Sequence, residues 1–213
     1  MRMLELFSGT EVLSETFRRA GHDAVSVEVD ERFNPTIRTN ILNIDWNQFA
    51  DDNGRFDVLW ASPPCTTYSV VAIGRHRHKN KETGECEAFS EEARIGDALL
   101  LQTLKAIEVL RPKLWFIENP RAGMRTMKCM RELPKYTVTY CQYGMPFMKP
   151  TDIWTNHPTP SFRPPCHYGD PCHVAAPRGS GLGLKALPRG KERSRLPQQL
   201  CDEVLRMCEE VIG

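Results

Sequence analysis

The chain has 213 residues, 40% of them hydrophobic and 26% charged, which predicts one globular domain with a small appendage and excludes a disordered or fibrous protein. Neither a secretory signal nor a run of about 20 apolar residues is visible, so we expect no membrane partner and eight reduced cysteines, as in a cytoplasm. The net charge of +1 argues against a strong general attraction to nucleic acid.

Along the first part of the chain, short continuous apolar runs alternate with segments whose apolar residues recur at helical spacing. Strands are predicted at residues 3–7, 25–29, 56–61 and 114–117, and helices at residues 12–20 and 95–110. Strands that alternate with helices indicate an α/β fold with a doubly wound, mostly parallel sheet and right-handed crossovers.

The remaining segments are less regular. Residues 74–87 are polar, basic and contain glycine, which predicts a mobile loop, and residues 134–143 predict a strand pair or a strand with its turn. Residues 157–193 are rich in Pro, Gly, His and Arg and predict a small irregular insertion. Helical spacing returns at 196–212. We therefore divide the chain into a core (1–156), the insertion (157–193) and a C-terminal helix that returns to the core (194–213).

Polar residues follow each of the four predicted strands, where ligands of doubly wound sheets bind. These residues are Ser8-Gly9-Thr10, Glu28-Val29-Asp30, residues 62–69 and Glu118-Asn119-Pro120. A carboxylate at the end of the second strand can accept from both hydroxyls of a ribose. Glu28 suits that role, with Asp30 as the competing candidate and a solvated carboxylate as the alternative.

Two of these strand ends carry a potential nucleophile and acid. Pro63 and Pro64 fix the backbone before Cys65, which would present a thiol rigidly to a ligand, although a lone cysteine is more often a small buried hydrophobe. Burial at the end of an apolar strand favours the protonated form of Glu118, which could donate a hydrogen bond. A thiolate and such an acid are what nucleophilic addition to an electron-poor ring requires.

Taken in order, these motifs resemble those of the DNA cytosine C5-methyltransferases, particularly the short members found in phages and prophages. The resemblance covers nearly the whole chain. The matching segments are Leu6-Phe7-Ser8-Gly9, Arg19-Ala20-Gly21, Glu28, Pro64-Cys65 with Ser69, Glu118-Asn119, Tyr143-Gly144-Met145-Pro146 and Ser194-Arg195-Leu196-Pro197.

The resemblance implies a Rossmann-like methyltransferase fold, S-adenosylmethionine as cofactor and cytosine in DNA as substrate. It implies that Cys65 adds to carbon 6 of a flipped cytosine while Glu118 donates to ring nitrogen 3, with Ser69 and Asn119 in the catalytic motifs. Phe7 would pack on the adenine, Ser8, Gly9 and Thr10 would line the methionine moiety, and Glu28 would hold the ribose. Further cofactor contacts are implied for Val29, Asn40, Ile41, Pro64, Ser194 and Leu196.

The chain also departs from the family pattern. Thr10-Glu11-Val12 stands where the family often has further glycines, and Asn40 stands where an Asp usually binds the adenine amino group. The usual Arg-x-Arg pair is replaced by Lys149-Pro150-Thr151, in which Lys149 would hold a phosphate or the loop and Thr151 would reach the base. The long variable recognition segment of full-length relatives is missing, which predicts short or relaxed sequence discrimination.

Two basic clusters gain a role from the resemblance. The loop of residues 66–89 would close over the flipped base, with its basic residues touching phosphates. Solvated loops are the alternative. The first cluster comprises Arg75, His76, Arg77, His78, Lys79 and Lys81, and the second Arg178, Lys185, Arg189, Lys191, Arg193 and Arg195.

The insertion also contains potential metal ligands. Cys166, His167, Cys172 and His173 could bind zinc, but adjacent Cys-His pairs are not the usual finger spacing, and we favour a compact Pro/Gly-rich loop without metal.

Three alternative functions stay open at this point. One is the same chemistry on RNA or a free cytidine nucleotide, another is a noncatalytic nucleic-acid-binding module with a degenerate methyltransferase fold, and the last is a zinc-binding interaction protein. We expect a cytoplasmic protein of a bacterial or phage-infected cell. Host protection by restriction-modification and phage genome modification are equally compatible, as is a monomer.

Overall fold

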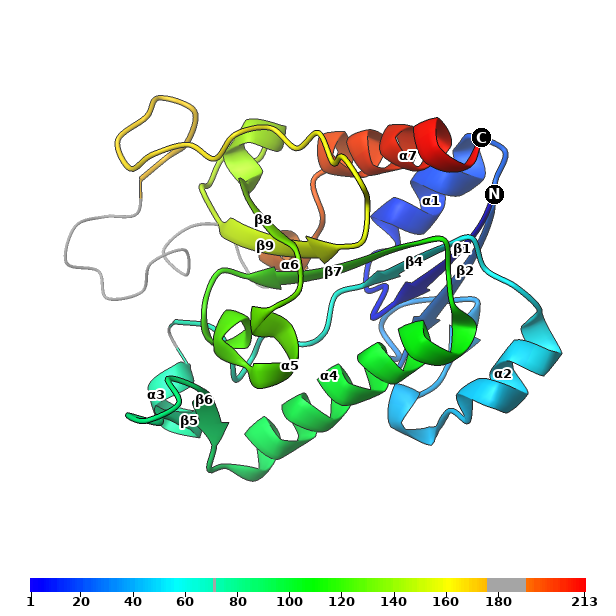
Figure 1. The fold of residues 1–213 in the computed structure, drawn as a ribbon. Helices are drawn as coiled ribbons and strands as arrows, with labels where there is room; N and C mark the ends of the chain where they lie inside the picture. Colours follow the sequence, from blue (N-terminus) through cyan, green and yellow to red (C-terminus); the bar gives the residue numbers. More distant parts are fainter. Residues whose placement is uncertain (71, 176–190) are drawn as a thin grey trace.

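A seven-stranded sheet runs through the centre of the computed structural model, which describes residues 1–70, 72–175 and 191–213 (Figure 1). The strand order is β3-β2-β1-β4-β7-β9-β8; the first five strands are parallel, and β9 runs antiparallel to both its neighbours. The predicted α/β fold with a mostly parallel sheet is therefore confirmed. The strands are β1 Arg2–Leu6, β2 Asp23–Glu28, β3 Ile37–Arg38, β4 Val58–Ala61, β7 Leu114–Pro120, β8 Lys135–Thr139 and β9 Pro150–Thr155.

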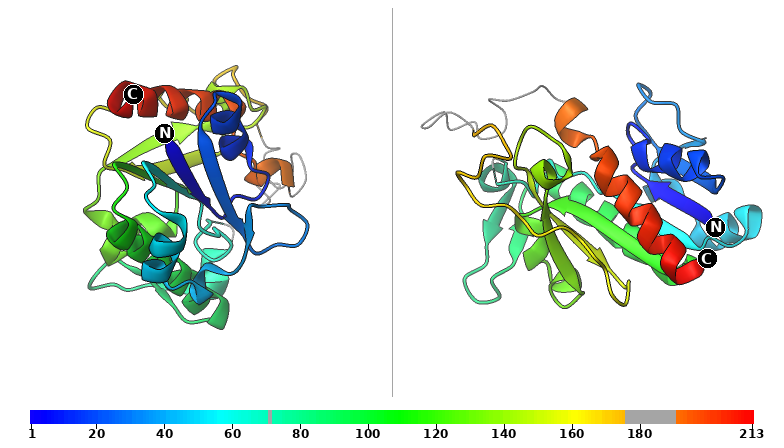
Figure 2. Two further views of the ribbon diagram at one scale, coloured as in Figure 1. Left: turned by 90° about the vertical axis from the view of Figure 1, so that its right-hand side faces the viewer. Right: turned by 90° about the horizontal axis from the view of Figure 1, so that it is seen from above.

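Helices cover both faces of this sheet. Helices α1 (Val12–Arg19) and α7 (Gln198–Ile212) pack together on one face, and α2 (Trp46–Asn53) and α4 (Glu91–Leu110) pack together on the other (Figures 1 and 2). The described chain also contains the short helices η1 Ile41–Asn43, α3 Ile73–His76, η2 Gly123–Thr126, α5 Lys128–Arg131, η3 Tyr140–Tyr143 and α6 Lys191–Ser194.

The core forms because strand residues alternate between the two faces. Met3 belongs to a buried cluster with Phe17 of α1 and Leu200 of α7, whereas its neighbour Leu4 packs in a separate cluster with Trp46 of α2. Both faces of the central strands are thus apolar, as expected for a parallel sheet covered on both sides.

Helix α4 begins four residues before the predicted start at residue 95. The side chain of Ser90 accepts a hydrogen bond from the amide of Ala93 at 3.2 Å and so caps the N-terminus. At the other end Arg111 has a φ of 47°, which ends the helix just before Pro112. The amphipathic spacing of the sequence predicted the helix, and the Ser90 cap determines the residue at which it begins.

The prediction of a mobile loop at residues 74–87 is wrong in part. Strands β5 (Arg77–Lys79) and β6 (Cys86–Ala88) form an antiparallel hairpin there. The carbonyl of the Asn80 side chain accepts from the amides of Glu82 and Thr83, which fixes the turn. The hairpin lies beside the N-terminal end of α4 (Figure 1).

Other elements were missed or differ. The predicted strand at 134–143 is β8 followed by the turn η3, and its partner in the sheet is β9, which was not predicted. Helix α2 was also missed, although Asp45 caps it by accepting from the amides of Asn47 and Gln48. Residues 157–175 form neither helix nor strand, as expected for the insertion.

Within the described residues, no helix is both long enough and apolar enough to cross a bilayer. Of the second basic cluster, Arg178, Lys185 and Arg189 lie outside the described residues, as do the side chains of Lys191 and Arg193.

Candidate active site

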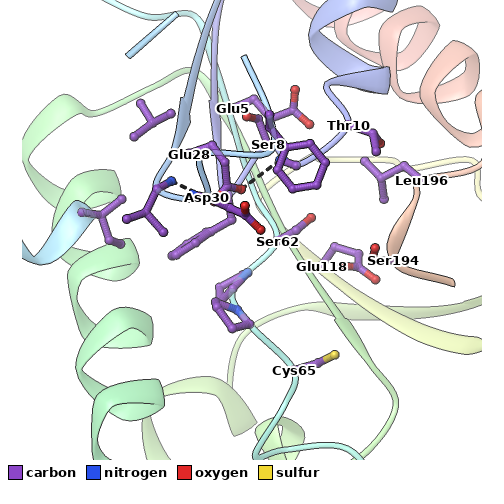
Figure 3. A pocket seen from close by; sticks show the side chains of 18 of the residues that line it. Glu5, Ser8, Thr10, Glu28, Asp30, Ser62, Cys65, Glu118, Ser194 and Leu196 are labelled. Carbon is purple, nitrogen blue, oxygen red and sulfur yellow. Dashed lines mark hydrogen bonds between the residues drawn. The ribbon is translucent and has the colours of Figure 1, made fainter. Parts of the chain in front are cut away.

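A pocket of about 300 Å³ opens at the carboxyl ends of β1, β2, β4 and β7, where the sequence predicted the ligand site (Figure 3). All the predicted cofactor contacts line it: Phe7, Ser8, Gly9, Thr10, Glu28, Val29, Asn40, Ile41, Pro64, Ser194 and Leu196. Three predicted catalytic residues line the same pocket, namely Cys65, Glu118 and Lys149.

The turn after β1 has an unusual backbone. Phe7, Gly9 and Glu11 all have positive φ angles, of 59°, 48° and 54°, a region that only glycine adopts without strain. A Cβ atom built at Gly9 would meet nothing within 4 Å, so the backbone here borders open space. The Ser8 hydroxyl is buried and has no hydrogen-bond partner among the described residues, which leaves it available for a polar group of a ligand.

Glu28 is held firmly at the end of β2. One carboxylate oxygen accepts from the amide of Gly9 at 3.0 Å, and the other accepts from the amides of Val29 and Asp30 at 2.8 and 3.0 Å (Figure 3). Asp30 also lines the pocket, but its carboxylate is engaged by the guanidinium of Arg32. The geometry thus favours Glu28 over Asp30 as the group that faces a ribose.

Asn40 lines the pocket, where the adenine contact was expected, but its side-chain oxygen already accepts a hydrogen bond from the backbone. It accepts from the amide of Leu42 at 3.0 Å and caps η1. An amide oxygen has two lone pairs, so one remains for a ligand amino group.

Contacts before and after Cys65 hold its backbone. The buried side-chain amide of Asn119 donates to the carbonyl of Pro63 at 2.8 Å. The carbonyl of Cys65 itself accepts from the amides of Tyr68 and Ser69 at 3.1 and 2.9 Å, forming a helical turn. Asn119 and Ser69 therefore shape the loop around the thiol rather than line the pocket.

Glu118 lies near the end of β7 and is 5% exposed. Strand β7 pairs with β4, and Cys65 lies in the loop that follows β4. The hydroxyl of Tyr140 donates to its Oε1 at 2.9 Å, and Lys149 Nζ lies 3.8 Å from the same oxygen. The ammonium group of Lys149 also stands over the ring of Tyr140, 4.3 Å from its centroid. In Figure 3 Cys65 lies at the lower end of the pocket, Glu28 and Asp30 lie toward the upper end, and Glu118 lies between these levels beside Ser194.

Four influences act on the pKa of Cys65. Burial raises the pKa of the thiol, the positive charge of Lys149 lowers it, the negative charge of Glu118 raises it, and a hydrogen bond with the backbone lowers it. The net effect is a pKa above the ordinary value of 9.0. The resting thiol is therefore protonated at neutral pH, and Lys149 is the neighbour that favours the thiolate.

Thr151 does not lie where the sequence analysis expected it. Its side chain is fully buried, and its hydroxyl donates to the carbonyl of Lys149 at 3.2 Å. Thr151 therefore supports the backbone of Lys149 instead of reaching a base in the pocket.

Glu5 lines the pocket and was not predicted. It is 2% exposed, and burial raises its pKa to about 7 even though the amide of Ser14 donates to it at 3.0 Å. An ionisable residue in the middle of an apolar strand was the signal that could have found it. Other lining residues that sequence reasoning did not select include Phe33, Thr39 and Leu99.

The first basic cluster needs one correction. Arg77 does not reach toward phosphates, because its side chain is fully buried between the hairpin and α4. Its guanidinium donates to Asp97 at 2.7 Å and to the Thr67 hydroxyl at 3.1 Å, and it stacks 3.9 Å from the centroid of the Tyr68 ring. The exposed members of the cluster include Arg75, His78, Lys79 and Lys81.

The predicted metal candidates separate into two groups. Cys166, Cys172 and His173 gather with Cys141 of η3, which the sequence analysis did not consider. His167 points away, because its side chain is 90% exposed and lies near Asp170 instead.

Comparisons with known proteins agree with this site. Residues 1–138 match the family described as C-5 cytosine-specific DNA methylase. A Frog virus 3 protein named "Probable DNA (cytosine-5)-methyltransferase" is 31% identical over 229 residues, which cover 98% of this chain and 100% of the relative.

The chain belongs to the C-5 cytosine-specific DNA methylases. This confirms the resemblance seen in the sequence and makes the chain a DNA (cytosine-5)-methyltransferase, for which family and fold imply S-adenosylmethionine as methyl donor. The alternatives of a noncatalytic module and of an interaction protein lose their support.

Solved structures of other proteins are similar to this methylase in fold, although their sequence identity to it is low. The Entamoeba histolytica methyltransferase EhMeth aligns with a TM-score of 0.54 and 14% identity over 83% of this chain and 58% of its own. The S. pombe Dnmt2 methyltransferase aligns with a TM-score of 0.50 and 16% identity over 73% of this chain and 50% of its own. The chain thus spans little more than half the length of these proteins.

Proposed function

We propose that this chain methylates carbon 5 of cytosine in DNA with Cys65 as the nucleophile and Glu118 as the group that hydrogen-bonds the ring. Cys65 follows β4, and Glu118 lies on the neighbouring strand β7. The observation that carries the proposal is that both side chains line one pocket, together with the carboxylate of Glu28.

The residues of the pocket fit the cofactor. The fixed carboxylate of Glu28 suits a ribose, and the unpartnered Ser8 hydroxyl beside the open backbone at Gly9 suits the polar end of a methionine moiety. Phe7 offers an aromatic face for adenine. When bound, S-adenosylmethionine supplies an electrophilic methyl group for carbon 5.

Cys65 acts by adding to the ring. Its thiol loses its proton, and the sulfur forms a bond to carbon 6, which shifts the electron pair of the 5,6 double bond to carbon 5. Glu118 meanwhile hydrogen-bonds ring nitrogen 3 and favours this addition. Once carbon 5 has been methylated, its proton leaves, the sulfur–carbon 6 bond breaks and Cys65 leaves as a thiolate.

Lys149 supports both residues. Its charge lowers the pKa of Cys65 and lies 3.8 Å from Glu118, so it favours the thiolate while orienting the carboxyl group. Asn119 and Ser69 hold the loop that carries Cys65, and Thr151 holds the backbone of Lys149.

The DNA would contact the same edge of the molecule. A stacked base must flip out of the duplex to reach Cys65, at a cost of a few kcal/mol. The exposed Arg75 of α3 and Lys79 and Lys81 of the hairpin would neutralise phosphates. Residues 1–156 and 194–213 would form the catalytic unit, and residues 157–193 the short recognition segment.

The biological setting is also a proposal. We infer that the chain acts as a monomer in the cytoplasm of a bacterial or phage-infected cell. The Frog virus 3 relative supports methylation of a viral genome over restriction-modification.

The test is methyl transfer by the purified chain. Label from the methyl group of S-adenosylmethionine should enter unmethylated duplex DNA, and Cys65→Ser and Glu118→Gln should each lower the rate by at least about 100-fold. Cys129→Ser, a half-buried cysteine outside the pocket, is the matched control and should retain the rate.

A duplex with 5-fluorocytosine adds a second readout. Fluorine in place of the carbon 5 proton cannot leave as a cation, so the sulfur–carbon 6 bond persists and Cys65 should carry the base in mass spectrometry. Label in RNA or dCMP but not in DNA would replace the proposed substrate. No transfer to any of them would overturn the proposal.

A further inference from the structure

Four potential metal ligands meet away from the pocket. Cys141 lies in η3, and Cys166, Cys172 and His173 lie in the irregular segment of residues 157–175. Their Sγ and Nδ1 or Nε2 atoms all lie within 4.8 Å of one another. We call these four residues the thiol–imidazole cluster. Because Cys141 is distant in the sequence, neither the spacing nor the motif around Cys166 revealed the complete set.

The separations within the cluster match a tetrahedral site. Zinc–sulfur bonds of about 2.3 Å and zinc–nitrogen bonds of about 2.0–2.1 Å place tetrahedral ligands about 3.8 Å (S–S) or 3.6 Å (S–N) apart. The separation is 3.7 Å from Cys172 Sγ to Cys141 Sγ, and 3.5 and 3.7 Å from His173 Nδ1 to the sulfurs of Cys172 and Cys166. The two sulfurs of Cys141 and Cys166 are closer, at 3.0 Å, and would separate around a cation.

The surroundings of the cluster also fit a bound cation. The side-chain amide of Gln142 donates to Cys172 Sγ at 3.6 Å, a contact that a metal-bound thiolate accepts better than a thiol does. Cys141 and Cys166 are buried, which excludes water from the ligands. Thiol groups are weak hydrogen-bond partners, so contacts between thiols give little reason to gather three of them.

The segment that carries three ligands is packed in its first part and exposed near the ligands. Residues 157–175 form neither helix nor strand; Phe162 packs against the core and the amide of Arg163 donates to the Tyr143 hydroxyl, whereas Tyr168 and Val174 are 68% and 60% exposed. The backbone is nevertheless anchored on both sides of the ligands. The amide of Cys166 donates to the Thr139 hydroxyl at 2.9 Å, and the amide of Val174 donates to the carbonyl of Pro146 at 2.8 Å. A metal cross-link is a common substitute for a hydrophobic core in such a segment.

We propose that Cys141, Cys166, Cys172 and His173 bind one structural zinc ion, which pins the segment of residues 157–175 to η3. Three thiolates and one imidazole in a tetrahedron select zinc over calcium or magnesium, which prefer oxygen ligands. All four positions are filled by protein ligands, so the ion has no open position for chemistry. The site is independent of the pocket and of the reaction proposed there.

Metal content of the purified full-length chain tests the proposal without any activity measurement. We expect one zinc ion per chain by elemental analysis. Replacement by Co²⁺ should give the visible absorption of tetrahedral cobalt with a sulfur-to-cobalt charge-transfer band. Absence of both zinc and this cobalt spectrum would overturn the proposal. So would a Cys141–Cys166 disulfide found by mass spectrometry in the metal-free chain.

Variants identify the ligands. Cys166→Ser and Cys172→Ser should each lose zinc or bind it at least tenfold more weakly, and the cobalt spectrum should lose sulfur character. His167→Ala and Cys129→Ser are the matched controls, because His167 is exposed and Cys129 lies outside the cluster. Should a serine variant fail to fold, the cobalt spectrum of the unaltered chain still decides the question. Full zinc content in both serine variants would overturn the assignment.

Discussion

Lys149 connects the two catalytic candidates. It lies 3.8 Å from Glu118, and its charge opposes the burial and the negative neighbour that raise the pKa of Cys65. A cation at this position therefore increases the amount of thiolate at neutral pH, although burial is the larger influence on the pKa of Cys65. Sequence comparison alone assigned Lys149 to a phosphate or the loop, because the residue replaces an arginine of the family pattern and nothing in the spacing places it beside the thiol.

The first prediction concerns Lys149→Met. Removal of the charge should raise the pKa of Cys65 further and lower the thiolate fraction at pH 7. The rise of the single-turnover methylation rate with pH should move to higher pH accordingly. Alkylation of Cys65 by iodoacetamide, followed across pH by mass spectrometry, measures the thiolate directly. Lys149→Arg keeps the charge and should keep the profile; unchanged alkylation in the methionine variant would contradict the assignment.

The second prediction concerns Glu5. Its folded-state pKa of about 7 lies above the ordinary value of 4.5, so the folded protein holds this proton more tightly than the unfolded chain does. The stabilisation is complete below about pH 4.5 and is lost as the pH rises through 7. The loss amounts to roughly 3 kcal/mol.

Glu5→Gln should remove this dependence, since a neutral amide can still accept from Ser14. The free energy of unfolding in urea, measured from pH 5 to 8, should fall less steeply in the variant than in the unaltered chain. Glu15→Gln, on the exposed face of α1, is the control and should leave the slope as it is. Parallel curves for the Glu5 variant and the unaltered chain would refute the raised pKa.

At the scale of elements, the hairpin of β5 and β6 is tied to α4 through Arg77. The guanidinium is completely buried, donates to Asp97 and to backbone carbonyls of Cys86 and Ala93, and stacks on Tyr68. Tyr68 follows Cys65 by one helical turn, so the network also fixes the far side of the loop that carries the thiol.

The third prediction is that Arg77→Met destabilises the protein by about 3 kcal/mol. The substitution removes the positive partner that Arg77 gives to Asp97, which keeps the Tyr68 hydroxyl as a donor, and it takes the guanidinium away from the carbonyls of Cys86 and Ala93. Methionine fills only part of the space. Urea unfolding at neutral pH measures the change. Arg94→Met removes an exposed arginine of α4 that pairs with Glu91, and should cost less than about 0.5 kcal/mol. Equal effects of the two substitutions would mean that the network contributes nothing beyond a surface ion pair.

Strands β1, β2, β4 and β7 were predicted because their apolar runs are continuous and end in polar residues at the pocket edge. Strand β9 was missed because it begins at Pro150 and contains Asp152, a buried carboxylate that pairs with Arg125. The hairpin was missed because its inward residue is a charged arginine, whose burial depends on partners from α4 that no local pattern reveals.

For the site, the residues that the order of motifs predicted as cofactor contacts all line one pocket, because strand ends converge by topology. The supporting contacts could not be predicted. The hydrogen bond from Tyr140 to Glu118 and the cluster of Cys141 with Cys166 depend on where η3 packs, and η3 follows a strand whose pairing partner was not recognised.

At the scale of the whole molecule, the segment proposed for recognition is short. Only the residues between β9 and α6 separate the core from its final helices, and the described part of this connection is irregular. The EhMeth and S. pombe Dnmt2 chains are about one and a half times as long. A small recognition surface can contact few base edges, which limits sequence discrimination.

The fourth prediction follows from this small surface. Bisulfite sequencing of DNA from cells that express the chain should show methylated cytosines in a short shared context, with several neighbouring positions variable. Cells that express Cys65→Ser serve as the control and should show no added methylation. A long invariant context around every modified cytosine would contradict the prediction.

The packing of α7 has a consequence for synthesis of the protein. Met3 and Trp60, on early strands, share one buried cluster with Leu200 and Met207 of α7, and Leu196 beside that helix closes the pocket. A nascent chain leaves the ribosome N-terminus first, so this face of the sheet stays exposed to water until α7 emerges. The apolar surface is open to chaperones and to aggregation during that interval, and the pocket lacks its lining residues Ser194 and Leu196 until the chain just before α7 has been made.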